Sequence, residues 1–300
     1  MTEFVQHLIN GFSVGSMYAL IAIGYTLVFG VLQLINFAHA EVFMLGSFVG
    51  MYSALFFGFG KTSSLLGLFL ILAISMVACA CVGFTIERFA YRPLRKAPRI
   101  NVLITAVGVS MFLQFTGQLF FGSDPKFFPQ IYVPTSYWVI GNVQINPLQI
   151  FVLVIAMSLM FVLHELVFHT WLGRAMRAVC FNHDLASLMG IPVNRVISYT
   201  FMVGSSLAGA AGVLVGLTYP KIEPLMGVMP GLKAFVAVVL GGIGSIQGAV
   251  LGSLILGLSE EFVVGYWAPT FRDALSFGIL ILILLVKPKG IFGKIQIEKV

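Results

Sequence analysis

The sequence predicts an all-α polytopic membrane protein, folded as a single transmembrane domain over residues 1–300, with about eight hydrophobic helical segments, some broken or re-entrant. Hydrophobic residues make up 59% of the chain and charged residues only 9%, whereas a soluble domain carries roughly 25% charged residues. Apolar runs that match the roughly 20 residues needed to cross a bilayer recur along the chain. These runs lack the apolar–polar alternation of membrane β-strands.

The apolar runs define the expected helices, which cover 5–31, 38–59, 64–86, 100–121, 148–169, 196–219, 232–258 and 271–286. Basic residues orient them, because excess Lys and Arg marks cytoplasmic loops. Twelve of the 17 basic residues lie in two loops and the tail, namely Arg88, Arg92, Arg95, Lys96 and Arg99, then Arg174, Arg177 and Arg195, then Lys287, Lys289, Lys294 and Lys299. We attribute the formal charge of +6 to these cytoplasmic segments and expect no nucleic-acid partner.

The remaining loops are poorer in basic residues and should face outward. They lie around Lys61 and at 122–147, 220–231 and 265–272. Two arrangements of the first segments stay open. If both 5–31 and 38–59 cross, the N-terminus is outside, and if only one crosses, it is inside.

The run 232–258 is interrupted by glycine and serine residues over 241–248. Such residues weaken a helix and permit turns. An odd number of crossings must lie between the outer end of 196–219 and a cytoplasmic tail, whereas 232–258 and 271–286 would make two crossings if each spanned once. We therefore expect 232–258 to form two half-helices that enter from outside and return outside. Irregular backbone at membrane depth is tolerated inside protein or beside a water-filled cavity.

Three polar residues, Asn36, His39 and Glu41, interrupt the hydrocarbon between the first two runs. An ionisable group inside a membrane run is a functional hypothesis by default, and the alternative is solvation at an interface. His39 and Glu41 do not share a helical face, so a turning backbone fits this group. The hypothetical substrate pathway comprises Asn36, His39, Glu41, Gly241, Gly242, Gly244 and Ser245.

Small residues recur every four positions in three runs, which allows close helix contacts. These are Gly11, Gly15 and Ala19, then Gly204, Ala208, Gly212 and Gly216, then Gly248 and Gly252. We expect them to pack within the chain, with contact to a second membrane subunit as the alternative. Charged residues at helix ends, including the adjacent pair Glu87 and Arg88, are expected to be solvated.

The passage 174–195 is polar and carries too many central charges to cross a bilayer. Its apolar residues have the spacing of one helical face. They are Met176, Val179, Leu185, Leu188 and Met189. Such a passage lies on the membrane surface or docks on a soluble partner.

Several motifs are absent. The chain has no G-x-x-x-x-G-K-S/T phosphate loop and no G-x-S-x-G elbow. Its three cysteines give no disulfide framework. No motif indicates an enzyme, a cofactor or a metal site, and we expect none of the three.

Three passages carry a family resemblance. GSMYALIAIGYTLVFGVLQLINFAHAEVFMLGSF, LGRAMRAVCFNHDLASLMGIPVNRVISYTFMVGSSLAGAAGVLVG and MPGLKAFVAVVLGGIGSIQGAVLGSLILGLSEEF resemble the inner-membrane permeases of branched-chain amino acid ABC importers, LivH type. The resemblance covers nearly the whole chain. It departs from the family at Ala40, where the family usually has Gly.

The resemblance implies a permease subunit in the bilayer of a bacterial inner membrane that imports branched-chain, hydrophobic amino acids. The implied partners are a second, LivM-like permease, two cytoplasmic ATPases and a periplasmic amino-acid-binding protein. Passage 174–195 is similar to the coupling helix that enters a groove on the ATPase. Its implied coupling residues are Arg174, Arg177, Ala186, Leu188, Met189, Gly190 and Ile191.

Three alternatives remain. Permeases for urea or short-chain amides share the same scaffold. A channel or ion-coupled carrier works without partners. A membrane-embedded enzyme is the third class, although no catalytic grouping at usable spacing occurs in the sequence.

Overall fold

A computed structural model describes residues 2–33, 36–59, 64–95, 97–131, 138–140 and 143–293 of the chain. It confirms an all-α membrane protein. Of the basic residues named above for the loops and the tail, Lys61, Lys96, Lys294 and Lys299 lie outside the described residues.

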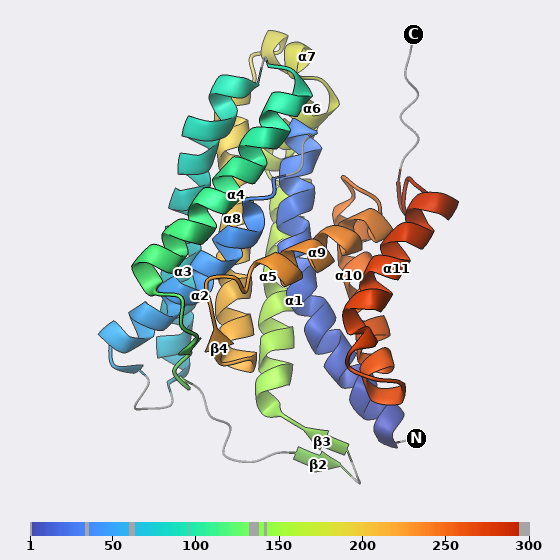
Figure 1. Ribbon diagram of the computed structural model, residues 1–300. Coiled ribbons are helices and arrows are strands. Elements are labelled where there is room, and N and C mark those ends of the chain that lie inside the picture. Colours follow the sequence, from blue (N-terminus) through green and yellow to red (C-terminus); the bar gives the residue numbers. More distant parts are fainter. Residues whose placement is uncertain are drawn as a thin grey trace.

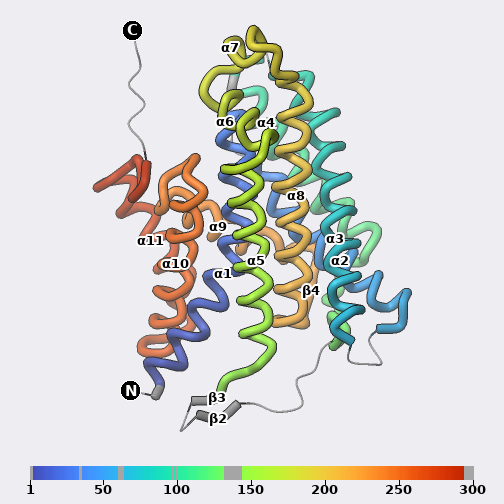
Figure 2. The backbone as a smooth tube through the Cα atoms, turned by 180° about the vertical axis from the view of Figure 1, so that it is seen from behind, coloured from blue at the N-terminus to red at the C-terminus, as the bar shows by residue number. Residues whose placement is uncertain are grey.

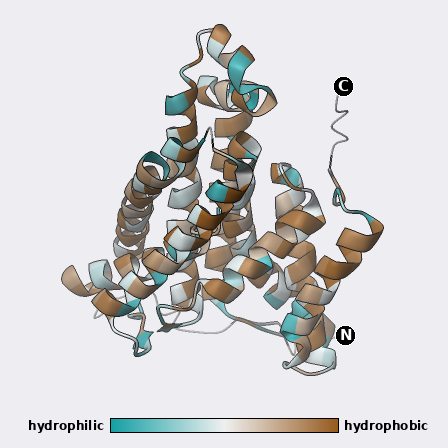
Figure 3. Ribbon diagram, turned by 45° about the horizontal axis from the view of Figure 1, so that its top comes forward, coloured by the Kyte–Doolittle hydropathy of each residue, from teal (hydrophilic) through white to brown (hydrophobic). Residues whose placement is uncertain are grey.

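The fold consists of long helices that run side by side along one main direction and of shorter helices that join or cross them (Figure 1). They are α1 (Thr2–Leu32), α2 (His39–Phe56), α3 (Leu65–Ile86), α4 (Arg99–Phe121), α5 (Pro147–His169), α6 (Trp171–Phe181), α7 (His183–Leu188), α8 (Val193–Thr218), α9 (Val228–Gly241), α10 (Ile246–Tyr266) and α11 (Phe271–Val286). A π-helix, η2 (Glu87–Tyr91), and a 3-10 turn, η3 (Arg92–Leu94), continue α3. Six helices in the described part are long and apolar enough to cross a membrane. Hydrophobic residues dominate along them (Figure 3).

The strands are short and serve as loop connections. β1 (Lys126–Phe127) pairs antiparallel with β4 (Lys221–Ile222), so Lys126 faces Ile222. β2 (Trp138–Ile140) pairs antiparallel with β3 (Val143–Ile145). The β1–β4 pair joins the loop after α4 to the loop after α8, two loops that the sequence assigns to the same side.

Two helices form the centre of the bundle. In the most apolar stretch of α1, 83% of the residues are buried, and in that of α8 the share is 78%, against 17% for α4. α1 packs against α10 on one side and α8 on the other, while α2 and α3 cover α8 (Figure 2). α4 lies at the periphery, where its apolar side chains remain exposed.

The small-residue stripes pack within the chain, as expected. A Cβ atom at Gly15 would lie 2.9 Å from the Cα of Leu254 in α10. A Cβ atom at Gly212 would overlap the carbonyl oxygen of Phe43 in α2 and lie 2.7 Å from the Ser47 amide nitrogen. The Ser47 hydroxyl donates to the Gly212 carbonyl at 2.7 Å. Small residues thus let α1 approach α10 and α8 approach α2 almost backbone to backbone.

The two ends of the bundle differ in their elements. α6 and α7 lie at one end and the N-terminus of α1 at the other (Figure 1). The His7 ring lies 5.5 Å from the Tyr266 ring, which places the start of α1 beside the end of α10. At the α6–α7 end, Arg95 donates to the Asn194 side chain at 2.7 Å, so two of the basic loops meet there. This arrangement favours the alternative in which the N-terminus is opposite to the cytoplasmic loops.

The break in the run 232–258 falls where the sequence predicts it. α9 ends at Gly241 and α10 begins at Ile246 after the Ser245 side chain accepts a hydrogen bond from the Gly248 amide. The expectation of two half-helices is wrong for the second piece. α9 has 14 residues, but α10 has 21 and is long enough to cross. The helix passes the predicted end at 258 because its two acidic residues, Glu260 and Glu261, are paired within the chain.

Replacing Gly212 with alanine tests the contact between α2 and α8. The added methyl group has no space beside Phe43 and Ser47, so we expect destabilisation by about 1–3 kcal/mol. The measurement is the thermal unfolding temperature of the detergent-purified protein. Gly108→Ala in α4 is the matched control, because nothing lies within 4 Å of the added atom. Equal unfolding temperatures for the two variants would contradict this packing.

Candidate functional site

The polar group between α1 and α2 is buried inside the bundle. Asn36 is 2% exposed, His39 is fully buried and Glu41 is 2% exposed. The chain turns before His39, where α2 begins, so the three side chains do not share one continuous helix. The expected turning backbone is therefore present, and the expectation that Glu41 is solvated at an interface is not met.

Asn36 has a structural partner. The Tyr91 hydroxyl donates to Asn36 Oδ1 at 2.8 Å, and the Asn36 carbonyl accepts from the His39 amide at 3.1 Å. Tyr91 belongs to the π-helix η2 and is almost fully buried. Asn36 thus fixes the turn before α2 to the end of the α3 segment.

His39 packs into α1. A Cβ atom at Gly24 would overlap the His39 ring, so this glycine makes room for the imidazole. The Tyr25 ring meets it edge-on with a centroid distance of 4.9 Å. Within the described residues, neither ring nitrogen of His39 has a hydrogen-bond partner.

Glu41 lies where α2, α4 and α9 meet. Its Oε1 atom accepts from the Ser110 hydroxyl of α4 at 3.4 Å. Its Oε2 atom has no hydrogen-bond partner within the described residues. A Cβ atom at Gly227, directly before α9, would lie 3.4 Å from Oε2. The carboxylate therefore points at the start of the short helix.

The glycine break lies at the other end of α9. The amides of Ile291 and Phe292 donate to the carbonyls of Leu240 and Gly241, both at 2.9 Å. Gly242 and Gly244 have positive φ values of 107° and 90°, which glycine adopts readily. Since α9 has 14 residues, the break and Glu41 are separated by about 20 Å at 1.5 Å per residue. The structure does not bring the two predicted pathway groups together, but α9 joins them.

The passage 174–195 forms two helices instead of one amphipathic helix. The Asn182 side chain accepts from the amides of Asp184 and Leu185 and starts α7. In α6, Met176 and Val179 are buried in the core, whereas Leu185 and Leu188 of α7 are exposed. The single apolar face predicted from spacing is wrong, because the helix direction changes at Asn182.

The expected coupling residues divide into exposed and internal groups. Leu188 and Met189 are each 83% exposed, and Gly190 turns the chain with a φ of 80°. Ile191 is partly buried and packs against the core. Ala186 is buried, and its carbonyl accepts from the Ile191 amide at 3.0 Å. Ala186 therefore serves as a turn residue of the passage.

The basic residues of the passage differ in their contacts. Arg174 is exposed. Arg177 donates to the backbone carbonyl of Val167 and lies over the Phe168 ring at 5.5 Å, so it fixes α6 to the end of α5. A ring nitrogen of His183 lies 2.8 Å from the Val31 carbonyl at the end of α1. The exposed tip is thus tied to the central helix.

An ion network that the sequence analysis did not predict lies among α1, α9, α10 and α11. Glu260 is fully buried and pairs with Lys233 of α9 at 3.0 Å and with Arg272 of α11 at 3.0 Å. Lys233 also pairs with Asp273 at 2.8 Å, and Arg272 with Glu261 at 2.6 Å.

Two hydroxyl groups complete the network. The Tyr18 hydroxyl of α1 donates to Glu260 Oε2 at 3.0 Å, and Ser276 donates to Oε1. A lysine within an apolar run is the sequence signal that could have indicated this network, because an ionisable group at membrane depth needs a partner.

A second buried ion pair joins η2 to the start of α8. Glu87 pairs with Arg95 and accepts from the Ser198 hydroxyl at 2.6 Å. The expectation that Glu87 is solvated is wrong, because the residue is fully buried. Burial lowers the pKa of the Arg95 guanidinium from its ordinary value, while the Glu87 carboxylate acts in the opposite direction.

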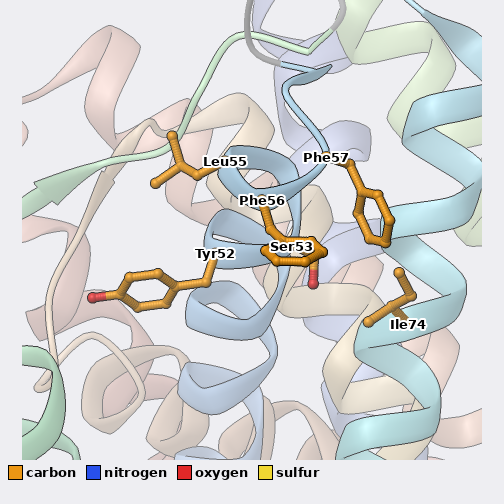
Figure 4. Close-up of a pocket in the computed structure, with 6 residues that line it drawn as sticks. All are labelled: Tyr52, Ser53, Leu55, Phe56, Phe57 and Ile74. Carbon is orange, nitrogen blue, oxygen red and sulfur yellow. The ribbon is translucent and has the colours of Figure 1, made fainter.

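A surface pocket of about 770 Å³ lies between the end of α2 and α3, and it contains none of the predicted site residues. It is lined by Tyr52, Ser53, Leu55, Phe56, Phe57 and Ile74. In Figure 4, Phe57 lies beside Ile74 and Tyr52 points to the opposite side. Apart from Tyr52 and Ser53 its lining is apolar, so it offers few polar groups to orient a ligand.

Apolar helices around a buried polar turn, with a short helix beside it and an exposed tip at one end, define the class of polytopic membrane proteins. The chain belongs to the family of branched-chain amino acid transport system permease components, whose family model matches residues 7–284.

Three relatives illustrate the similarity. The high-affinity branched-chain amino acid transport system permease protein BraD of Pseudomonas aeruginosa is 43% identical over 99% of this chain and 98% of its own length. The corresponding protein LivH of Escherichia coli K12 is 42% identical over the same shares. A probable LivH permease of Methanocaldococcus jannaschii is 28% identical over 93% of this chain and 89% of its own length. No solved structure matches the chain.

Replacing Lys233 with methionine tests the ion network. Breaking a buried pair leaves Glu260 uncompensated and costs about 3–5 kcal/mol, so we expect a large fall in the thermal unfolding temperature. Lys221→Met is the matched control, because its pair with Glu223 is exposed at both partners and contributes about 0–1 kcal/mol. The double variant Lys233→Met with Glu260→Gln should recover part of the loss. Similar behaviour of the two lysine variants would contradict a stabilising network.

Proposed function

We propose that this chain is the membrane-spanning permease subunit of an ATP-driven importer for branched-chain, hydrophobic amino acids in a bacterial inner membrane. The observation that carries the proposal is the similarity to BraD and LivH, which extends over 99% of the chain. Both are named as permease proteins of high-affinity branched-chain amino acid transport systems.

The proposed complex contains a second, LivM-like permease, two cytoplasmic ATPases and a periplasmic amino-acid-binding protein. Two observations support the ATPase partners. The sequence has no phosphate loop of its own. The exposed apolar side chains of Leu185 and Leu188 lie on α7, and that of Met189 lies directly after it, at one end of the bundle. Such an exposed apolar tip suits a groove on a soluble partner.

The proposed mechanism is alternating access driven by the ATPases. α6 and α7 lie between α5 and α8, and Arg177 and His183 fix them to α5 and α1. Closure of the ATPase pair on binding ATP displaces α7, and these contacts pass the displacement to the central helices. The ATP-bound ATPase pair shifts the permease only if it binds the outward state and the inward state of the permease with different affinities.

The proposed substrate pathway runs past the start of α2 and along α9. Glu41 and the break at 241–245 lie near opposite ends of α9, which therefore borders the route for most of its length. Asn36 and His39 hold the turn before α2 in place through their contacts with Tyr91 and Gly24. They are proposed to shape the pathway there.

The test of this function is purification in mild detergent with mass spectrometry of the co-purifying proteins, followed by reconstitution in proteoliposomes. We expect a phosphate-loop ATPase, a second permease and ATP-driven uptake of radiolabelled leucine in the presence of the binding protein. Uptake of urea or a short-chain amide in place of leucine would support the alternative substrate class. Uptake driven by an ion gradient without ATP would support a self-sufficient carrier and overturn the proposal.

The coupling role of α7 gives a separate prediction. In the variant Leu188→Ser with Met189→Ser, we expect the permease to insert normally but to lose co-purifying ATPase and ATP-driven uptake, because both side chains are exposed and hold nothing within the chain. Phe56→Ser is the matched control, since Phe56 is 84% exposed and lies at the end of α2. ATPase binding at the wild-type level in the α7 variant would remove α7 from the interface.

A further inference from the structure

The buried carboxylates of the chain differ in whether a lysine or arginine pairs with them. Four glutamates are buried within the described residues, namely Glu41, Glu87, Glu260 and Glu261. Three of them pair with an arginine or lysine of the chain. Glu41 has no ion pair within the described residues, and its Oε2 atom accepts no hydrogen bond there.

The contacts that Glu41 does make are too weak to compensate a buried charge. The hydrogen bond from Ser110 is 3.4 Å long, whereas strong hydrogen bonds to carboxylates measure about 2.7–2.9 Å. Glu41 also lies in the first turn of α2 and faces the start of α9. A helix N-terminus contributes about 0.3–1 kcal/mol to an anion, while burying a carboxylate costs several kcal/mol.

Glu41 itself is buried, and its one hydrogen-bond donor among the described residues lies on a helix at the periphery of the bundle. The Ser110 side chain that contacts it is only partly buried and belongs to α4, the most exposed of the long helices. Met111 of α4 and Met229 of α9 are about half exposed beside this junction in sequence. Within the described residues, the Glu41 carboxylate therefore lies beside two helix starts, and no lysine or arginine pairs with it.

We propose that Glu41 binds the α-ammonium group of the transported amino acid at the junction of α2, α4 and α9. This inference rests on the proposed function and names the recognition chemistry of its pathway. An ammonium group has three donors and one positive charge, so it supplies both the hydrogen bond that Oε2 lacks and the missing counter-charge. A keto acid or amide without this charge leaves Glu41 uncompensated.

The experiment uses the reconstituted complex with Cys79, Cys81 and Cys180 replaced by alanine and with Ser110→Cys as a reporter beside Glu41. The thiol is treated with a cationic trimethylammonium-ethyl or an anionic sulfonato-ethyl methanethiosulfonate. We expect the cationic reagent to react at least about tenfold faster, and the preference to vanish in Glu41→Gln. Leucine should slow the reaction, whereas 4-methyl-2-oxopentanoate, which has the same carbon skeleton without the ammonium group, should not.

Uptake of leucine provides the second readout, measured with the native Ser110. Glu41→Gln keeps the shape and removes the charge, so we expect at least about tenfold slower uptake, with partial recovery in Glu41→Asp. Glu165→Gln is the control for loss of an exposed carboxylate. Wild-type uptake in Glu41→Gln, equal rates for the two reagents, or no protection by leucine would each overturn the inference. Absence of ATP-driven leucine uptake in the unmodified complex would instead overturn the proposed function.

Discussion

The ion network around Glu260 joins the four helices on which the rest of the structure depends. Its carboxylate receives Lys233 from α9, Arg272 from α11 and the Tyr18 hydroxyl from α1. Charges in an apolar surrounding are stable only when paired and hydrogen-bonded. This network therefore fixes the short helix α9 against the central helix. At the end that carries α6 and α7, Glu87 pairs with Arg95 and accepts a hydrogen bond from Ser198, which fixes η2 against α8.

Much of the fold follows from the sequence because a bilayer constrains backbone strongly. Seven of the eight predicted apolar runs correspond to one helix each, and the eighth, 232–258, divides into α9 and α10 at the glycine break that composition indicates. The repeat of small residues in α8 indicated close packing, and Gly212 lies against the backbone of α2. These predictions succeed because length, hydropathy and side-chain size act locally.

The failures concern contacts between segments that are distant in sequence. The predicted apolar run ends at residue 258, but Lys233 and Arg272 pair with Glu260 and Glu261 beyond it, and α10 continues. Met176 and Leu188 share a helical spacing, but Asn182 turns the chain between them, so one is buried and the other exposed. Burial of Glu41 likewise depends on where α4 and α9 pass, and no local pattern contains that information.

The anchoring of α9 at both of its ends has a mechanical consequence. Gly227 and Gly231 rest on the first turn of α2, and the carbonyls of Leu240 and Gly241 accept from the backbone that follows α11. A hydrogen-bonded helix of 14 residues is stiff over its length of about 20 Å. The helix therefore holds its two ends at a fixed separation, so the first turn of α2 and the backbone near Phe292 keep their distance for as long as α9 stays helical.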